Sequence, residues 1–165
     1  MKIESIEVRK SKKEALKYIL GKIPLMSKVS QFNTVVTDVH LEYIEIKVLN
    51  YEIISKEKTK KMFRHEMKTN YITMLVNTYS GYSESVDLLP DTTRRYVTKS
   101  CIKKSKIGEE DIIEGVKNEI LNFLDQKNDS PDKISLQNIS IKEIKSIYKP
   151  YWVASFKGRS ILLEA

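Results

Sequence analysis

The chain has 165 residues, of which 41% are hydrophobic and 31% are charged, and its formal net charge is +7. These values suit one folded domain with a strongly charged surface and exclude a disordered chain, while the single cysteine excludes an intramolecular disulfide. No apolar run reaches the roughly 18 residues of a membrane span, and the segment after Met1 lacks the apolar centre of a secretory signal. We therefore expect a single domain over residues 1–165, located in the reducing cytoplasm and without membrane contact.

The first predicted elements are a short strand and an amphipathic helix. Residues 2–9 alternate polar and branched apolar side chains, which is typical of a strand. Ser11 and Glu14 have the spacing of a capping box, in which each side chain bonds to the backbone N–H of the other residue, so a helix is expected to begin at Ser11. Pro24 ends its apolar run. The apolar residues at helical spacing are Ala15, Leu16, Ile19, Leu20 and Ile23.

Beyond residue 35 the apolar pattern changes from helical to alternating, which predicts consecutive antiparallel strands. Ser80 and Gly81 are expected to form a hairpin turn, because glycine accepts the positive φ that such turns need. A polar stretch at 55–61 predicts another turn. The predicted strands cover residues 40–54, 62–79, 82–88 and 92–104.

The clearest helix of the sequence covers residues 109–126. Three acidic residues fill its first turn, where negative charge complements the helix dipole. Its apolar stripe is expected to lie on the sheet and to bury Ile112, Val116, Ile120 and Phe123. A loop at 127–132 follows, and then extended segments at 134–141 and 144–156, a turn at 157–159 and a last strand at 160–164.

This order of elements predicts the fold class. Runs of strands joined by hairpins, with the helices set apart, are typical of α+β proteins. We expect a curved antiparallel β-sheet with the long helix of the C-terminal half and the short N-terminal helix packed on it.

No motif for catalysis or metal binding stands out. His65 and Glu66 begin a zinc-protease motif, but Thr69 occupies the place of the second histidine. Cys101 has lysines nearby, yet no cysteine-hydrolase pattern surrounds it. The sequence therefore favours a protein without enzymatic activity, bound metal or cofactor. An unrecognised enzyme that uses Cys101, His65 or a pair of carboxylates is a third hypothesis.

Basic residues concentrate in two of the predicted strands. The segment 94–106 contains six basic residues and no acidic one. If its strand paired beside the strand at 62–79, a basic face with nearby aromatic rings would suit single-stranded nucleic acid. The alternative is that the lysines protect an edge strand from aggregation. The basic residues predicted to bind a partner are Arg64, Lys68, Arg94, Arg95 and Lys99.

Aromatic residues surround Pro150 near the C-terminus. A proline within a strand indicates an edge or a bulge, and tyrosine and tryptophan are enriched in binding hot spots. We expect Trp152 to be buried against the apolar face of the long helix. Tyr148 or Tyr151 is expected to be accessible, and both belong to the predicted binding set.

The leading hypothesis is a non-catalytic binding or protein-interaction domain, such as an adaptor or an assembly subunit. Its partner would be another protein or a second copy of the chain. The alternative is a protein that binds nucleic acid, single-stranded in particular, without sequence specificity.

Overall fold

The computed structural model describes residues 1–22, 37–58, 65–127, 134–156 and 159–165. The predicted fold class is confirmed: seven strands form an open, mostly antiparallel sheet in a mixed α+β fold. The chain divides into two compact units, each made of segments distant in sequence. Unit 1 comprises residues 1–45, 90–104 and 147–165, and unit 2 comprises residues 46–89 and 105–146. Each unit has its own hydrophobic core, so the single domain expected from the chain length stays a prediction.

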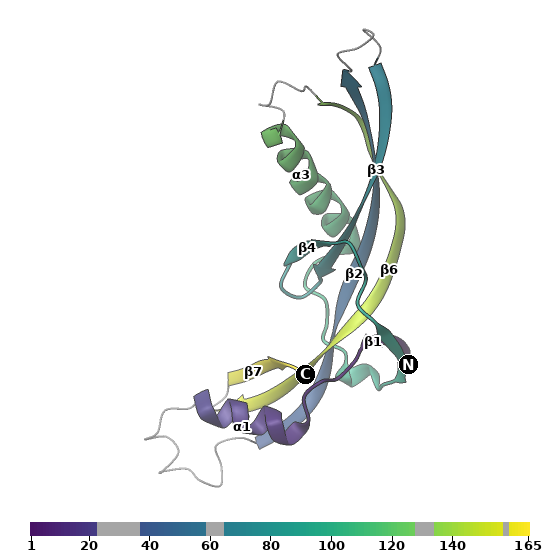
Figure 1. Cartoon of the computed structure of the whole chain (residues 1–165). Helices are drawn as coiled ribbons and strands as arrows, with labels where there is room; N and C mark the ends of the chain where they lie inside the picture. The colour runs from purple at the N-terminus through teal and green to yellow at the C-terminus, as the bar shows by residue number, and fades with distance from the viewer. Residues whose placement is uncertain (23–36, 59–64, 128–133, 157–158) are drawn as a thin grey trace. The chain divides into compact units, whose positions relative to one another are not determined.

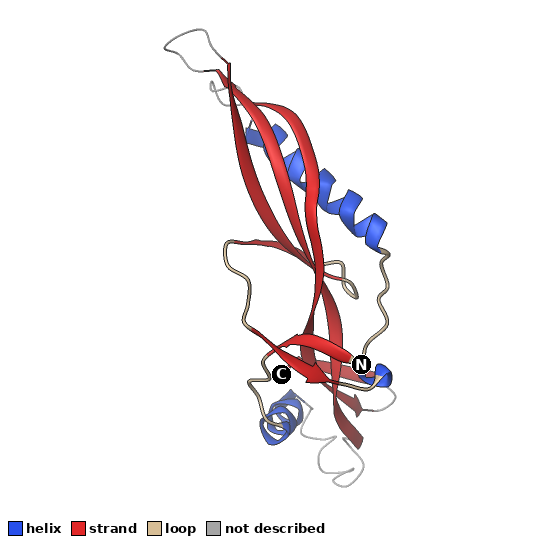
Figure 2. Ribbon diagram, turned by 90° about the vertical axis from the view of Figure 1, so that its right-hand side faces the viewer, coloured by secondary structure: helices blue, strands red, loops and turns tan. Residues whose placement is uncertain are grey.

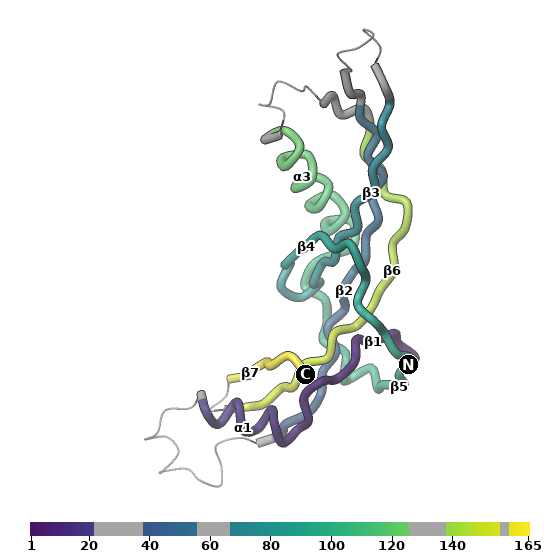
Figure 3. The backbone as a smooth tube through the Cα atoms, viewed as in Figure 1, coloured from purple at the N-terminus to yellow at the C-terminus, as the bar shows by residue number. Residues whose placement is uncertain are grey.

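Two long strands, β2 (Thr37–Lys58) and β6 (Ile134–Phe156), each contribute residues to both units (Figure 3). In unit 1, β6 is joined by β1 (Lys2–Ile6) and β7 (Arg159–Glu164). Strand β5 (Thr92–Tyr96) pairs antiparallel with β1, and the 3-10 helix η1 (Lys99–Cys101) follows β5. Among the described residues of this unit, α1 (Lys12–Lys22) is an α-helix (Figure 1).

In unit 2 the strand order is β4-β3-β2-β6, where β3 is His65–Asn77 and β4 is Ser83–Val86. Strands β2 and β3 pair without interruption from Ile46 opposite Asn77 to Lys58 opposite His65. Helix α3 (Glu109–Lys127) lies along one side of these strands (Figures 1 and 2). The described residues of unit 2 therefore form a single layer of strands with α3 on it.

The capping box predicted for α1 is present. The Ser11 N–H donates to Glu14 Oε2 at 2.8 Å, and the Glu14 N–H donates to Ser11 Oγ at 3.2 Å. These reciprocal bonds satisfy two backbone donors that have no partner within the helix. The helix buries Ala15 and Ile19 against Trp152 and Ala154 of β6, while Leu20 is exposed, contrary to the predicted apolar stripe.

The core of unit 2 forms where α3 meets the strands. Ile112, Val116 and Ile120 are buried, as predicted. They belong to one apolar cluster whose strand members are Leu49, Tyr51, Ile53, Met74, Val76 and Ile139. The prediction that Phe123 is buried is wrong, since 54% of this residue is exposed. It occupies a position on α3 one turn beyond Ile120, outside this cluster.

Several predicted boundaries are corrected. The turn expected at 55–61 is wrong for residues 55–58, where β2 continues to Lys58; residues 59–61 lie outside the described part. The segments 134–141 and 144–156 are one strand, β6. The strand expected over 92–104 ends at Tyr96, and Cys101 lies in η1. The hairpin turn is confirmed: Gly81 has φ +78°, and its N–H donates to the Asn77 carbonyl.

Candidate functional site

The basic residues predicted to share a face do not share a strand pair. Strand β5 pairs with β1 in unit 1, whereas β3 pairs with β2 and β4 in unit 2. The strand pairing on which the basic face depended, the Arg94 strand beside the strand at 62–79, is therefore not formed. Lys68 lies exposed on β3, and Arg64 lies outside the described residues. The partner of β5 is instead the N-terminal strand β1, which is distant in sequence.

Strands β1 and β5 form a small exposed surface of their own, which we call the β1–β5 face. Residues directly opposite each other in an antiparallel pair point to the same side. Ile3 is buried, so its neighbours Lys2 and Glu4 lie on the other side, opposite Tyr96 and Arg94. Tyr96 is 82% exposed. A shallow hollow of about 330 Å³ is lined by Lys2, Ile3, Glu4 and Arg94.

The remaining basic candidates of unit 1 differ in exposure. Arg95 points to the same side as the buried Ile3, and it is half-buried. Its Nε atom is buried without a hydrogen-bond partner among the described residues. Lys99 is exposed in η1. Arg94 therefore lies on the same face of β1 and β5 as the exposed ring of Tyr96.

The aromatic segment of β6 is part of the core of unit 1. Trp152 is 9% exposed, and its Nε1–H donates to the Lys10 carbonyl at 2.8 Å. The prediction of a buried Trp152 is confirmed, but its helical neighbour is α1 and not the long helix α3. Tyr148 and Tyr151 are half-buried. Burial raises the pKa of Tyr151 above its ordinary value of 10.0.

Pro150 does not mark an edge strand, as the sequence had suggested. It is fully buried, and β6 lies between β2 and β1 in the sheet. Two residues earlier, Tyr148 is opposite Ser5 of β1; one residue later, Tyr151 is opposite Glu164 of β7. The proline thus lies where β6 changes partner, a position that tolerates the missing backbone N–H.

In the described part of unit 2, one edge of β3 is open, a feature that was not predicted from the sequence. Strand β4 pairs only with Thr73–Val76 of β3. Among the residues that the structure describes, no strand pairs with that side of β3 from His65 to Ile72. Unpaired strand edges are templates for the addition of another strand. We call residues Met67–Tyr71 the β3 edge.

The hydrogen-bond pattern fixes which backbone groups point outward from the β3 edge. The Asn77 N–H donates to the Tyr82 carbonyl, so Asn77 directs its backbone groups toward β4. Bonded positions alternate along an antiparallel strand, and the β2–β3 register contains no bulge. The backbone N–H and C=O groups of Met67, Thr69 and Tyr71 therefore point away from β2. Consistently, Ser55 Oγ on β2 donates to the Lys68 carbonyl at 3.4 Å.

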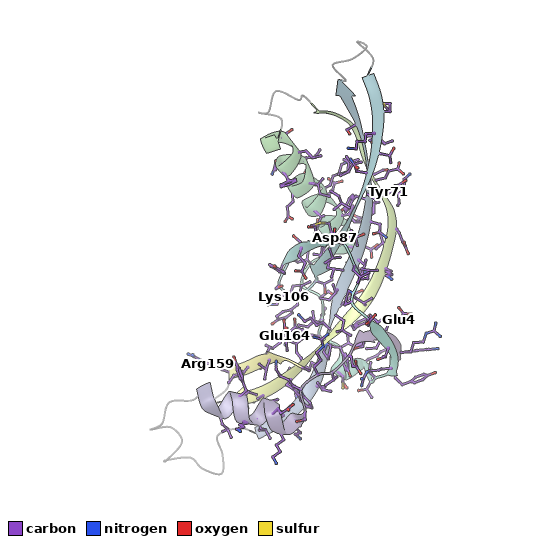
Figure 4. All side chains as sticks on the ribbon, in the orientation of Figure 1. Glu4, Tyr71, Asp87, Lys106, Arg159 and Glu164 are labelled. Carbon is purple, nitrogen blue, oxygen red and sulfur yellow. The ribbon has the colours of Figure 1, made fainter. Side chains whose placement is uncertain are left out.

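The side chains of the β3 edge are also uncovered. All five residues from Met67 to Tyr71 are exposed, Met67 by 59% and Tyr71 by 69%. Met74 and Val76 belong to the core beneath α3, so Met67, Thr69 and Tyr71, of opposite parity, lie on the face away from the helix. Figure 4 shows Tyr71 projecting from the strands. The sequence carried one sign of this edge, because the strand predicted at 62–79 was longer than its hairpin partner at 82–88.

Residues suited to catalysis or metal binding are dispersed. Within the described ranges, His, Cys, Asp and Glu side chains form no group of three or more that could hold a metal ion. The Cys101 Sγ lies 3.1 Å from Thr98 Oγ1. His40 lies between Asp38 and Glu42, and its hydrogen bond to Glu42 raises the pKa of the imidazole above 6.5. Among the described helices, none is long and apolar enough to span a membrane.

Comparison with known proteins gives no guide to function: no protein-family model, curated protein or solved structure matches the chain.

Proposed function

We propose that this chain is a non-catalytic assembly subunit, and that two copies join by pairing their β3 edges antiparallel. The observation that carries the proposal is the outward direction of the backbone groups of Met67, Thr69 and Tyr71 along an edge with no described partner strand. Addition of a strand at such an edge is a general mode of protein recognition, in which main-chain hydrogen bonds supply affinity.

A second copy suits this edge because the edge is complementary to itself. A two-fold interface requires that each contact be repeated in reverse. Pairing centred on Thr69 places Met67 of each copy opposite Tyr71 of the other, and a thioether beside an aromatic ring is a favourable contact. Thr69 then lies opposite Thr69, which is a favourable cross-strand pair.

The charges of the edge select the same register. Pairing centred on Thr69 places Lys68 opposite Asn70, whereas pairing centred on Lys68 would place two lysines opposite each other. Like charges in directly opposed positions are destabilising. The register centred on Thr69 also joins outward-pointing residues only to outward-pointing residues, so each opposed pair can exchange two backbone hydrogen bonds.

The contact is short, which sets the expected strength of association. A stable interface buries roughly 800 Å² on each partner, and five residues of one strand cover less. We therefore expect a reversible dimer whose formation depends on protein concentration. Sedimentation velocity over a concentration series should show monomers and dimers in exchange.

Thr69→Pro is the decisive variant for this experiment. Proline removes the outward N–H of Thr69 but leaves the ladder between β2 and β3 intact, so the variant should remain folded and monomeric at every concentration. Thr69→Ala keeps the N–H and is the matched control, which should still dimerise. A Thr69→Pro chain that dimerises like the unaltered chain would rule out this interface, as would an unaltered chain that is monomeric throughout.

A further inference from the structure

The net positive charge of the chain comes from unit 1. Unit 1 contains 16 lysines and arginines against eight acidic residues, a net charge of +8, whereas unit 2 contains 13 against 14, a net charge of −1. A composition bias toward lysine would raise the charge of both units. A concentrated positive field attracts polyanionic ligands, so the segregation favours unit 1 over unit 2 as the part that would bind one.

The β1–β5 face places two of the cations of unit 1, Lys2 and Arg94, beside an exposed aromatic ring. Tyr96 lies opposite Lys2 across the strand pair and two residues from Arg94 along β5. Residues two apart on a strand are about 6.6 Å apart, so one cation neighbours the ring across the strands and another neighbours it along β5. Cations beside an exposed ring suit single-stranded nucleic acid, with a base stacked on the ring and phosphates on the cations.

Glu4 is the acidic residue of the β1–β5 face, and it competes only weakly with a phosphate for Arg94. The Arg94 Nε lies 3.9 Å from Glu4 Oε1, and 72% of the Arg94 side chain is exposed. An exposed ion pair of this kind is weak and is screened by salt, so a phosphate can displace the carboxylate. The neighbouring hollow, lined by Lys2, Ile3, Glu4 and Arg94, offers concave surface beside the ring.

We infer that the β1–β5 face binds single-stranded nucleic acid without base specificity, with Tyr96 as the stacking platform and Lys2 and Arg94 as the phosphate contacts. This inference does not rest on the proposed assembly, because the residues of the β1–β5 face all belong to unit 1 and the β3 edge belongs to unit 2.

The test is fluorescence anisotropy with a labelled single-stranded oligonucleotide of mixed sequence, at roughly 50 and 200 mM salt. Tyr96→Ala should weaken binding about five-fold or more, whereas Tyr96→Phe, which keeps the ring, should bind like the unaltered chain. Arg94→Glu should weaken binding and reduce the steepness of the salt dependence. Glu4→Gln should tighten binding, because it removes the carboxylate that competes for Arg94.

Lys145→Glu is the matched control for Arg94→Glu. Lys145 is exposed on β6 within unit 2, and its reversal changes the net charge by about the same amount. It should leave affinity nearly unchanged. The inference is overturned if the oligonucleotide does not bind, if Tyr96→Ala binds as well as Tyr96→Phe, or if Lys145→Glu weakens binding as much as Arg94→Glu. The same order of oligonucleotide affinities is expected when each of these variants also carries Thr69→Pro. The result therefore does not depend on whether the chain dimerises.

Discussion

Trp152 joins β6 to helix α1 and to the segment just before that helix. Its ring packs with Ala15 and Ile19 of α1, and its N–H reaches the Lys10 carbonyl just before that helix. Tryptophan usually satisfies its N–H when it is buried. From the sequence we expected this residue to be buried, since the only tryptophan lay in an apolar strand. The sequence did not reveal which helix covers it. Both helices offer an apolar stripe, and helical spacing does not reveal which strand a stripe covers.

Truncation of Trp152 should destabilise the protein strongly. Trp152→Ala removes a large buried side chain and leaves a cavity, so we expect a loss of about 3–5 kcal/mol in the free energy of unfolding. Urea unfolding followed by circular dichroism measures this loss. Tyr96→Ala removes an exposed ring and should cost about 0.5 kcal/mol or less. Equal costs for the two variants would contradict the assignment of Trp152 to the core.

The raised pKa of Tyr51 leads us to expect a loss of folding stability at alkaline pH. Its hydroxyl donates to the Ile113 carbonyl. Burial, and to a smaller extent the charge of Glu114, raises the pKa of Tyr51 from 10.0 to about 12. Between these two values only the folded state holds the proton, so unfolding releases it and stability decreases as the pH rises. The contribution is complete below pH 10 and is lost toward pH 12.

Tyr51→Phe isolates this contribution. The variant should lose less stability than the unaltered chain between pH 10 and 12, although it is less stable at neutral pH because the Ile113 carbonyl loses its donor. Denaturant unfolding at several pH values measures both the stability at neutral pH and its decrease between pH 10 and 12. Parallel stability curves for the two proteins would show that Tyr51 titrates normally.

At the scale of elements, α3 is the part of the fold that was most accurately predicted. Its periodicity, acidic first turn and length are local properties, and the helix observed over Glu109–Lys127 matches the predicted one. Phe123 was misassigned because it lies at helical spacing from Ile120, while the apolar cluster beneath the helix does not include it. Periodicity gives the direction of a side chain but not the extent of the surface that it faces.

A charge at the centre of the α3 stripe should unfold unit 2. Ile120→Asp places a carboxylate without a partner in the apolar cluster, so we expect a loss of more than about 4 kcal/mol. Asn118→Asp introduces the same charge at an exposed position of α3 and should cost about 0.5 kcal/mol or less. Circular dichroism melts distinguish the two. A cooperative native melt for Ile120→Asp would place the helix away from the strands.

The geometry of β3 makes a prediction that is independent of any partner. Thr69 directs its N–H outward, whereas Asn70 directs its N–H toward Ile53 of β2. Asn70→Pro removes a ladder hydrogen bond and should destabilise unit 2 by about 3 kcal/mol or more, while Thr69→Pro should cost far less. Thermal melts of the two variants measure the difference. The reverse order would mean that the edge presents the other set of backbone groups.

At the scale of the whole molecule, strand neighbours could not be predicted from the sequence. Strand β5 follows β4 in the chain, but it pairs with β1, about 90 residues earlier. For that reason Lys68, Arg94 and Arg95 were grouped as one basic face although their strands do not pair. The charge segregation was likewise hidden, because each unit is assembled from separated segments. Only the topology of the chain reveals which lysines belong together.

The two proposed binding surfaces lie in different units. The β3 edge of unit 2 offers backbone hydrogen bonds to a second copy, and the β1–β5 face of unit 1 offers cations and a ring to nucleic acid. A dimer would carry two such faces, and linked sites can bind a long ligand more tightly than one site does. Thr69→Pro should therefore weaken binding of a long oligonucleotide more than binding of a short one.

Disulfide trapping at Thr69 shows whether two copies of the chain pair at the β3 edge. In a Cys101→Ser background, Thr69→Cys places two thiols in directly opposed positions, where Cα atoms about 5.5 Å apart fall within the roughly 4.4–6.8 Å range of a disulfide. Met67→Cys is the control, since its two copies would be displaced by about 13 Å along the strands. Under mild oxidation the Thr69→Cys chain should become a covalent dimer and the Met67→Cys chain should not. Equal cross-linking of both variants, or none of either, would contradict the antiparallel pairing centred on Thr69.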